Sequence, residues 1–196
     1  MNNESELSPA VCERVVSLVN GATNQIVNVM VGGGRILVSS DPARIGTIHE
    51  GARRILAGEV EEIAIDAETA RNMQGVRPGY NGAVWKDGRK VACIGVSGDP
   101  AVAKPMQKLA ALVLLQELDR VGRADRERNL LADVRADIND IAERMGVLAI
   151  NGAVLAARSG EAGRGFKIVV AEMRKLAAQI GEKLSDLERR SKGVRI

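Results

Sequence analysis

The sequence predicts an α+β module followed by a long antiparallel helical hairpin. Up to about residue 98, short β-branched runs alternate with glycine turns and short helical segments. From there to about residue 180, apolar residues recur at steps of three and four. Gly160, Gly163 and Gly165 interrupt that pattern once and lower the cost of reversing the chain direction. These observations favour a small sheet-containing module with a two-armed helical extension.

The first elements are expected to be a helix and a β-hairpin. Ser8, an N-cap residue followed by proline, predicts a helix that ends near Gly21. The runs 25–31 and 35–39 flank a triple glycine, Gly32–Gly34, and predict two paired strands. A triple glycine can also cradle phosphate, but the lysine and hydroxyl residue of a phosphate-binding loop are absent here, which favours the turn.

Two short helices and a strand are expected next. Thr47 and Glu50 have the spacing of a capping box, which would start a helix through about Leu56. A short strand over 60–65 is followed by Asp66, which is expected to cap a second short helix.

A tight loop and a second hairpin complete the predicted sheet. The glycines and proline of 75–82 predict the loop. Strands over 83–85 and 91–96 are joined around Asp87-Gly88, a strong hairpin signal. Asp99, followed by proline, then begins a helix that is expected to continue into the first arm of the hairpin.

The two arms carry a heptad seam, the spacing that keeps one apolar edge of a helix facing a partner. The seam residues are Leu131, Val134, Ile138, Ile141, Met145 and Leu148, then Phe166, Val169, Met173, Leu176 and Ile180. Two arms of about 30 residues are each about 45 Å long and enclose no protected interior. We therefore expect a homodimer in which two hairpins form a four-helix bundle. The expected domains are 1–120 and 121–196.

The segments 148–153, 156–166 and 171–177 resemble the signalling tip of methyl-accepting chemotaxis proteins. The resemblance covers about the last third of the chain and includes small residues, charges and glycines as well as the apolar period. It implies a dimeric four-helix bundle whose tip packs into higher oligomers and binds a histidine kinase and a coupling protein. It also implies these partner-binding residues: Asn151, Arg158, Glu161, Arg164, Phe166, Glu172 and Arg174.

Two residues depart from that family. Leu155 stands where the family usually has glutamate, and Gly152 stands where it has alanine. Leu155 continues the seam, so it would strengthen bundle packing while removing a polar contact to partners. The pattern of Glu/Gln pairs among small residues that marks methylation sites is not found in the sequence.

The segments 40–52, 75–81 and 91–100 resemble, in family order, the sugar diacid recognition domain of carbohydrate diacid regulators. The resemblance covers about residues 10–120 and implies a sensor of a small hydroxy-carboxylate such as glucarate, galactarate or glycerate. The order of helices and strands is PAS-like. The helix-turn-helix segment of those regulators is not found here.

The residues of these segments suit an acidic ligand. Arg44 and Arg77 could each grip a carboxylate through two hydrogen bonds. His49 and Asn81 could bond hydroxyl groups, and the backbone N–H groups around Gly79, Tyr80 and Asn81 could add further donors. The alternatives are a surface role for Arg44, a packing role for His49 and an ordinary loop position for Arg77.

Composition excludes several classes of function. Residues 1–105 carry 11 basic and 12 acidic residues (net −1), and residues 106–196 carry 17 and 13 (net +4). This mild excess, interspersed with acids, predicts solvated helix faces, and with only 2% aromatic residues nucleic-acid binding is not expected. No apolar run is long enough for a membrane span, and the N-terminus lacks a signal-peptide core.

Cys12 and Cys93 lack metal-ligand spacing, and His49 is the single histidine. We therefore expect a cytoplasmic protein with no metal, cofactor or catalytic site. The expected function is that of a chemoreceptor-like transducer in which ligand binding shifts the helix after Asp99 and thereby the tip. The alternative is a dimeric sensor or scaffold that does not couple to a kinase.

Overall fold

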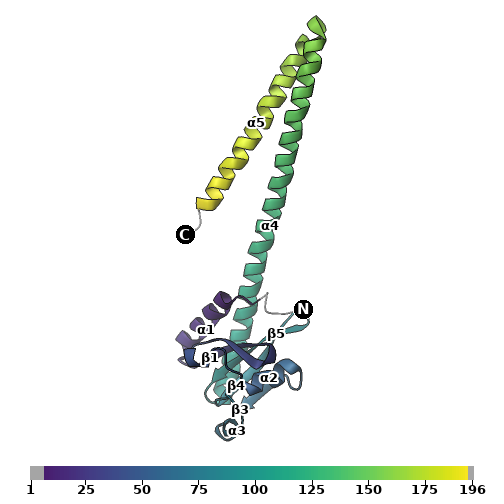
Figure 1. Ribbon diagram of the computed structural model, residues 1–196. Coiled ribbons are helices and arrows are strands. Elements are labelled where there is room, and N and C mark those ends of the chain that lie inside the picture. The colour runs from purple at the N-terminus through teal and green to yellow at the C-terminus, as the bar shows by residue number, and fades with distance from the viewer. Residues whose placement is uncertain (1–6, 194–196) are drawn as a thin grey trace. The chain divides into compact units, whose positions relative to one another are not determined.

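The computed structural model describes residues 7–193 and divides into two compact units, with the boundary between Arg123 and Ala124. The N-terminal unit is a five-stranded antiparallel sheet with helices on both faces. The C-terminal unit consists of two long antiparallel helices joined by a tight turn (Figure 1). The mixed class predicted from the sequence, a sheet followed by long helices, is confirmed.

The sheet has the strand order β2-β1-β5-β4-β3, and every neighbouring pair is antiparallel. The strands are β1 (Val27–Val31), β2 (Arg35–Ser39), β3 (Glu62–Ile65), β4 (Gly79–Lys86) and β5 (Arg89–Ser97). Both predicted hairpins are confirmed. A 3₁₀ turn over Gly32–Gly34 joins β1 to β2, and Asp87 and Gly88, both with positive φ, join β4 to β5.

The prediction of a loop over 75–82 is wrong in its second half, because β4 begins at Gly79. This part of β4 pairs on one side with β3 and on the other with β5. Gly79 packs against the backbone carbonyl of Val96 so closely that a Cβ would not fit. The glycines that indicate a loop in the sequence therefore serve close packing of a central strand.

Helix α1 (Pro9–Thr23) starts at the proline as predicted and ends two residues later than predicted. Asn24 adopts the left-handed conformation with φ 55° and donates its backbone N–H to the Asn20 carbonyl. The Thr23 hydroxyl donates to the Val19 carbonyl at 2.7 Å, which adds a contact to the last turn. Gly21 is thus accommodated inside the helix.

Helix α2 (Glu50–Ala57) is not started by the predicted capping box. His49 is its N-cap, and the imidazole Nδ1 accepts the backbone N–H of Ala52 at 3.2 Å. Thr47 instead donates its hydroxyl to the Arg44 carbonyl within the preceding loop. Asp66 caps α3 (Ala67–Arg71) through the N–H of Thr69 at 2.7 Å, which confirms the prediction for that helix.

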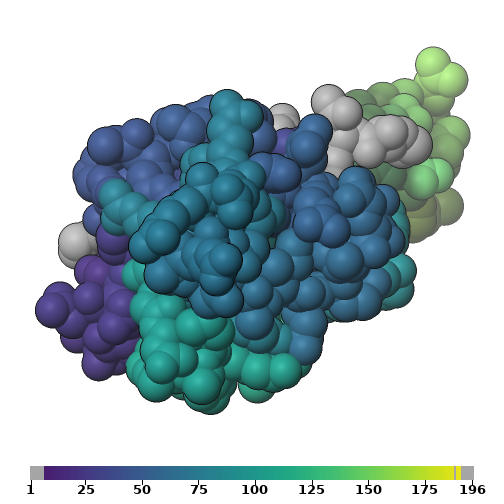
Figure 2. Space-filling model, turned by 90° about the horizontal axis from the view of Figure 1, so that it is seen from below, coloured from purple at the N-terminus to yellow at the C-terminus, as the bar shows by residue number. Residues whose placement is uncertain are grey.

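The sheet has a different hydrophobic cluster on each face. On one face, valines and alanines of the strands pack against α1 and against the first turns of α4 (Pro100–Arg158). On the other face, Met30, Ile36 and Cys93 pack against Ala52 and Ile55 of α2. Figure 2 shows purple α1 beside the green start of α4 on one side of this unit.

Helix α4 begins, as predicted, after Asp99, whose carboxylate accepts the N–H of Ala101 at 2.8 Å. It continues without interruption for 59 residues. A short 3₁₀ turn, η4 (Gly160–Gly163), then leads into α5 (Arg164–Gly193). Gly163 lies against the backbone carbonyl of Ala156, so a side chain at 163 would not fit.

Small residues make the contact between the two arms of the hairpin. Ala142, Ala149 and Ala156 of α4, spaced by seven, are buried, as is Val170 of α5. Most large seam residues are exposed in the single chain; these are Leu131, Val134, Ile138, Ile141, Leu148, Phe166, Val169 and Leu176. The predicted seam is therefore not the contact between the arms of one hairpin.

Candidate ligand site and hairpin surface

Arg44 is a buried cation at one corner of the sheet, in the loop between β2 and α2. It lies in the 3₁₀ turn η3 (Pro42–Arg44) and is only 9% exposed. Its Nη2 donates to the Gly75 carbonyl oxygen at 2.5 Å. Among the side chains that the structure describes, no carboxylate forms an ion pair with this guanidinium. A buried charge without a counter-ion is costly unless something else neutralises it.

Arg77 lies close enough to Arg44 for the two charges to repel. Burial lowers the pKa of Arg44, and the charge of Arg77 lowers it further, against the opposing effect of Asp41. Arg77 is itself paired with Asp41, with 3.0 Å between Nη2 and Oδ2. This corner therefore holds two guanidinium groups and one carboxylate, and an anion between the cations would be favoured.

His49 is a neutral hydrogen-bond donor at the same corner. Burial lowers the pKa of its imidazole to about 4, and the nearby charge of Arg44 contributes in the same direction. Because Nδ1 accepts the Ala52 N–H, the proton of the neutral ring is on Nε2. The imidazole thus caps α2 with one nitrogen and can donate with the other.

The three predicted residues of β4 do not lie together. Asn81 is on the α2 face of the sheet, and its Oδ1 lies over Gly95. Tyr80 is on the opposite face, where Lys104 of α4 lies 5.1 Å from its ring centroid. Because Gly79, Tyr80 and Asn81 pair with strands on both sides, their backbone groups belong to the sheet. The prediction that their N–H groups form a donor loop is wrong.

Two further polar residues lie at this corner, and the sequence gives only one sign of their burial. The Ser39 hydroxyl accepts the backbone N–H of Asp41 at 3.0 Å and donates to Asn28 Oδ1 at 2.7 Å. Asn28 and Ser39 are both buried. In the sequence, the one hint is a single asparagine within an otherwise apolar strand, Val27–Val31.

On the α4 side of the sheet, Glu62 of β3 binds two lysines of α4. Its carboxylate oxygens lie 3.0 Å from Lys104 Nζ and 3.0 Å from Lys108 Nζ. The nearby Tyr80 hydroxyl, followed by Lys108 and Lys104, lowers the pKa of Glu62 to about 2. Among the described residues the Tyr80 hydroxyl has no hydrogen-bond partner, whereas both lysines donate to the Glu62 carboxylate.

Gln107 of α4 is the second polar link between this helix and the sheet. It is buried, and its Nε2 donates to the Gly82 carbonyl of β4 at 3.1 Å. Its amide group occupies the space that a side chain at Gly82 would need. The strand that carries Asn81 is therefore bonded directly to α4.

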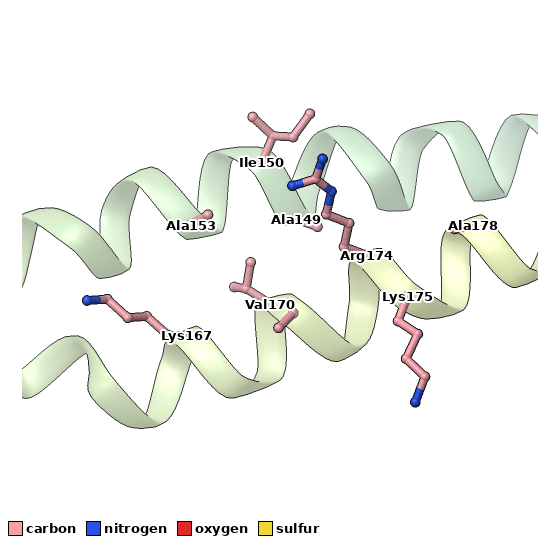
Figure 3. A pocket seen from close by; sticks show the side chains of 9 residues that line it. Ala149, Ile150, Ala153, Lys167, Val170, Arg174, Lys175 and Ala178 are labelled. Carbon is pink, nitrogen blue, oxygen red and sulfur yellow. The ribbon is translucent and has the colours of Figure 1, made fainter.

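In the hairpin, the seven residues predicted to bind partners are all exposed; these are Asn151, Arg158, Glu161, Arg164, Phe166, Glu172 and Arg174. Glu161 pairs with Arg164 at 3.1 Å, across the end of the turn. Arg174 lines an open groove of about 610 Å³ between α4 and α5. Figure 3 shows Ala149, Ala153 and Val170 facing this groove, with Lys167 and Arg174 beside them.

Membrane-spanning helices and clusters of metal-ligand side chains are both absent from the part of the chain that the structure describes. No helix there has the length and apolarity needed to cross a membrane. No group of three or more histidine, cysteine, aspartate or glutamate side chains is placed there to hold a metal ion.

Two family models match the chain. The sugar diacid recognition family matches residues 7–134, and the methyl-accepting chemotaxis protein signalling domain matches residues 103–189. The chain is 37% identical over 95 residues to the carbohydrate diacid regulator of Escherichia coli (strain K12), which covers 48% of this chain and 24% of the regulator. It is 48% identical over 52 residues to the methyl-accepting chemotaxis protein McpB of Bacillus subtilis (strain 168), which covers 26% of this chain and 8% of McpB.

The chain thus spans about a quarter of the length of the first of these relatives and less than a tenth of the second. No solved structure matches it. Both resemblances stated from the sequence are confirmed, in the predicted order along the chain. The first match covers well over half of the 196 residues. The chain therefore belongs to the sugar diacid recognition family, and its diacid recognition domain is followed by a methyl-accepting chemotaxis protein signalling domain.

Proposed function

We propose that this chain is a chemotaxis-type sensory transducer in which a PAS-like sensor, residues 1–120, controls a signalling hairpin, residues 121–196, in the cytoplasm. One observation carries the proposal: the two family matches overlap over residues 103–134, and all of these residues lie in α4. The helix that closes the core of the sensor is the same helix that forms the first arm of the hairpin. A change at the sheet therefore acts directly on the hairpin.

The ligand that best fits the sensor is a small hydroxy-carboxylate, of the sugar diacid kind. The buried guanidinium of Arg44 lacks a carboxylate among the described residues, and Arg77 lies nearby, so a carboxylate would relieve the repulsion between them. His49 supplies a neutral N–H donor and Asn81 a carboxamide for hydroxyl groups. A relative of this domain is named a carbohydrate diacid regulator, which agrees with this choice.

The hairpin is proposed to act as a homodimer in the form of a four-helix bundle. The arms of one chain meet through alanines, while the large seam residues remain exposed. An apolar edge of this length is typical of a protein interface. A second copy of the hairpin has the same edge at the same spacing and can cover it.

The exposed hairpin residues from Asn151 to Arg174 are proposed to contact a histidine kinase and a coupling protein, and to permit a higher oligomer through the tip. Support comes from the match to the chemotaxis signalling domain and from the exposure of these side chains. In this mechanism, ligand binding changes the populations of two α4 arrangements, which requires different ligand affinities in the two.

A second candidate function is a dimeric sensor or scaffold that binds the carboxylate without engaging a kinase. The observation that favours it is Leu155, which is 60% exposed near the end of α4. An exposed leucine in place of a carboxylate removes one polar contact that a kinase complex could use.

A thermal-shift screen of the full chain with glucarate, galactarate and glycerate tests the sensor. We expect at least one acid to raise the unfolding midpoint of the wild type, because a ligand that binds only the folded state stabilises it. Arg44→Met should abolish the shift, while Arg71→Met, at an exposed arginine of α3, should preserve it. If no acid shifts the wild type, the ligand assignment is wrong.

Co-precipitation with a chemotaxis kinase and coupling protein separates transducer from scaffold. If the chain is a transducer, the wild type is retained and Glu161→Ala reduces retention. If it is a scaffold, the wild type is not retained, and Leu155→Glu restores binding. Loss of binding in Leu155→Glu would contradict the role assigned to that position.

A further inference from the structure

A row of buried polar residues crosses the sheet on the α2 face. Ser39, Asn28, Gly95 and Asn81 are direct cross-strand neighbours on β2, β1, β5 and β4. Directly opposed residues of antiparallel strands point to the same face. Asn28 is 2% exposed and Asn81 is 3% exposed. Carboxamides at such positions, in the middle of a sheet, require an explanation.

Some amide groups of this row have no hydrogen-bond partner among the described residues. Asn28 Oδ1 accepts the Ser39 hydroxyl, but the structure records no acceptor for the Asn28 amide nitrogen among residues 7–193. The carboxamide of Asn81 has no hydrogen-bond partner among the same residues. The carboxamide atoms of Asn28 and Asn81 are not among the fully enclosed side-chain atoms without a partner, so their unused hydrogen-bonding groups are open to a small polar molecule that binds there.

Gly95 lies between the two asparagines and gives the row its shape. A Cβ at Gly95 would collide with Asn81 Oδ1 and lie 3.4 Å from the methyl carbon of Met30. The missing side chain therefore allows the carboxamide of Asn81 to lie across the sheet toward Asn28. Any side chain at residue 95 would displace it.

The row is continuous with the cationic corner. Ser39 accepts the N–H of Asp41, and Asp41 pairs with Arg77. Next to the row on the same face, Met30 and Cys93 pack against α2. A molecule with a carboxylate at Arg44 and Arg77 would thus place its next carbon atoms along the row.

We propose that Asn28 and Asn81, separated by Gly95, form the base of the ligand site and hydrogen-bond the hydroxyl groups of the ligand. This inference rests on the proposed function. A carboxamide offers both a donor and an acceptor, as does a sugar hydroxyl. The arginines recognise the carboxylate and the two asparagines recognise the hydroxylated carbons. The site thereby distinguishes a sugar acid from a plain aliphatic acid of the same length.

Calorimetric titration of the full chain tests this with three pairs of acids: galactarate and glucarate against adipate, and glycerate against propionate. The wild type should bind at least one hydroxylated acid roughly tenfold or more tightly than its plain counterpart, the factor expected for one or two lost hydrogen bonds. Asn81→Leu should bring the two affinities close together. Its affinity for the plain acid should not fall, since the arginines are intact.

Three variants complete the test. Asn28→Ala removes the second carboxamide, and Gly95→Ala keeps both asparagines but displaces Asn81, so both should lose discrimination as Asn81→Leu does. Asn139→Ala, at an exposed asparagine of the hairpin, should behave as the wild type. Since Asn81 is unpaired in the ligand-free protein, the unfolding midpoint of Asn81→Leu should not fall.

Two results would overturn the inference, and they differ. If the wild type prefers the hydroxylated acid and both Asn81→Leu and Gly95→Ala retain that preference, the role assigned to the two asparagines is wrong while the proposed function stands. If the wild type binds none of the acids, the proposed function is wrong, and so is the role assigned to the two asparagines.

Discussion

The two units of this chain handle their apolar residues in opposite ways. In the N-terminal unit, large side chains such as Leu114, Ile94 and Met30 are fully buried by elements of the same chain. In the described part of the C-terminal unit, the buried residues are alanines, glycines and one valine, and leucines such as Leu131 and Leu148 are 58% and 60% exposed. The first unit closes its own core, whereas the second presents an apolar edge.

The largest effect is expected in the closed core. Leu114→Ala removes a fully buried side chain of α4 and should lower the free energy of unfolding by about 2–5 kcal/mol. The loss should not depend on protein concentration, because the contacts lie within one chain. Urea denaturation at two concentrations measures it, with Leu148→Ala as the matched change in the hairpin. If the effect of Leu148→Ala is equally independent of concentration, the contrast between the units is wrong.

Acid should weaken the N-terminal unit through His49. Its pKa is about 4 when folded against 6.5 in the unfolded chain, so the unfolded chain takes up the proton first as pH falls. The contribution of neutral His49 to stability is fully present above pH 6.5. Between pH 6.5 and pH 4 the free energy of unfolding should fall by roughly 2–3 kcal/mol. Urea denaturation across this range measures the loss.

The control is His49→Asn, since asparagine can also cap α2 but does not titrate. It should flatten the curve between pH 6.5 and pH 4.5, above the range where protonation of Glu62 (pKa about 2 when folded) contributes. An unchanged slope in His49→Asn would show that another group is responsible.

The hairpin turn depends on Gly163 and not on Gly165. A side chain at Gly163 would collide with the backbone carbonyl of Ala156, whereas Gly165 has open space around it. Gly163→Ala should destabilise the hairpin by on the order of 2 kcal/mol. Gly165→Ala should stabilise it by about 0.5–1 kcal/mol, because alanine favours helix. Helix content during thermal unfolding distinguishes the two, and equal effects would contradict the close approach.

The smallest effect concerns the pair Gly152 and Val170. A Cβ at Gly152 would lie 2.7 Å from Val170 Cγ2, so Gly152→Ala should destabilise the wild type by roughly 1 kcal/mol. In Val170→Ala, the same substitution should become neutral or stabilising. A double-mutant cycle measures the coupling, expected at about 1 kcal/mol or more. Simple additivity would show that the two positions do not share this space.

Residues with local signals were well predicted from the sequence. Asp87-Gly88, the triple glycine and Asp66 act through the backbone next to them, and all three predictions are confirmed. Gly79 was misassigned because its role depends on Val96, seventeen residues away. The cap of α2 was misassigned because histidine is not among the usual capping residues.

In the hairpin and the candidate site, the sequence signal was incomplete for a different reason. The large seam residues dominate the apolar pattern, so the alanines at 142, 149 and 156 that join the arms were not identified. Buried polar residues such as Asn28 and Gln107 look like surface residues in a sequence, because only the fold shows what covers them. The cationic residues Arg44 and Arg77 were identified through the family resemblance.

The most direct measurement of the contrast between the units is sedimentation velocity of the full chain from nanomolar to micromolar concentrations. We expect a monomer–dimer equilibrium, since a second hairpin covers the exposed seam. A variant with Ile141→Glu and Leu148→Glu should sediment as a monomer while the N-terminal unit keeps its unfolding midpoint. A wild-type chain that remains a monomer at micromolar concentration, with its hairpin fully helical, would contradict the account.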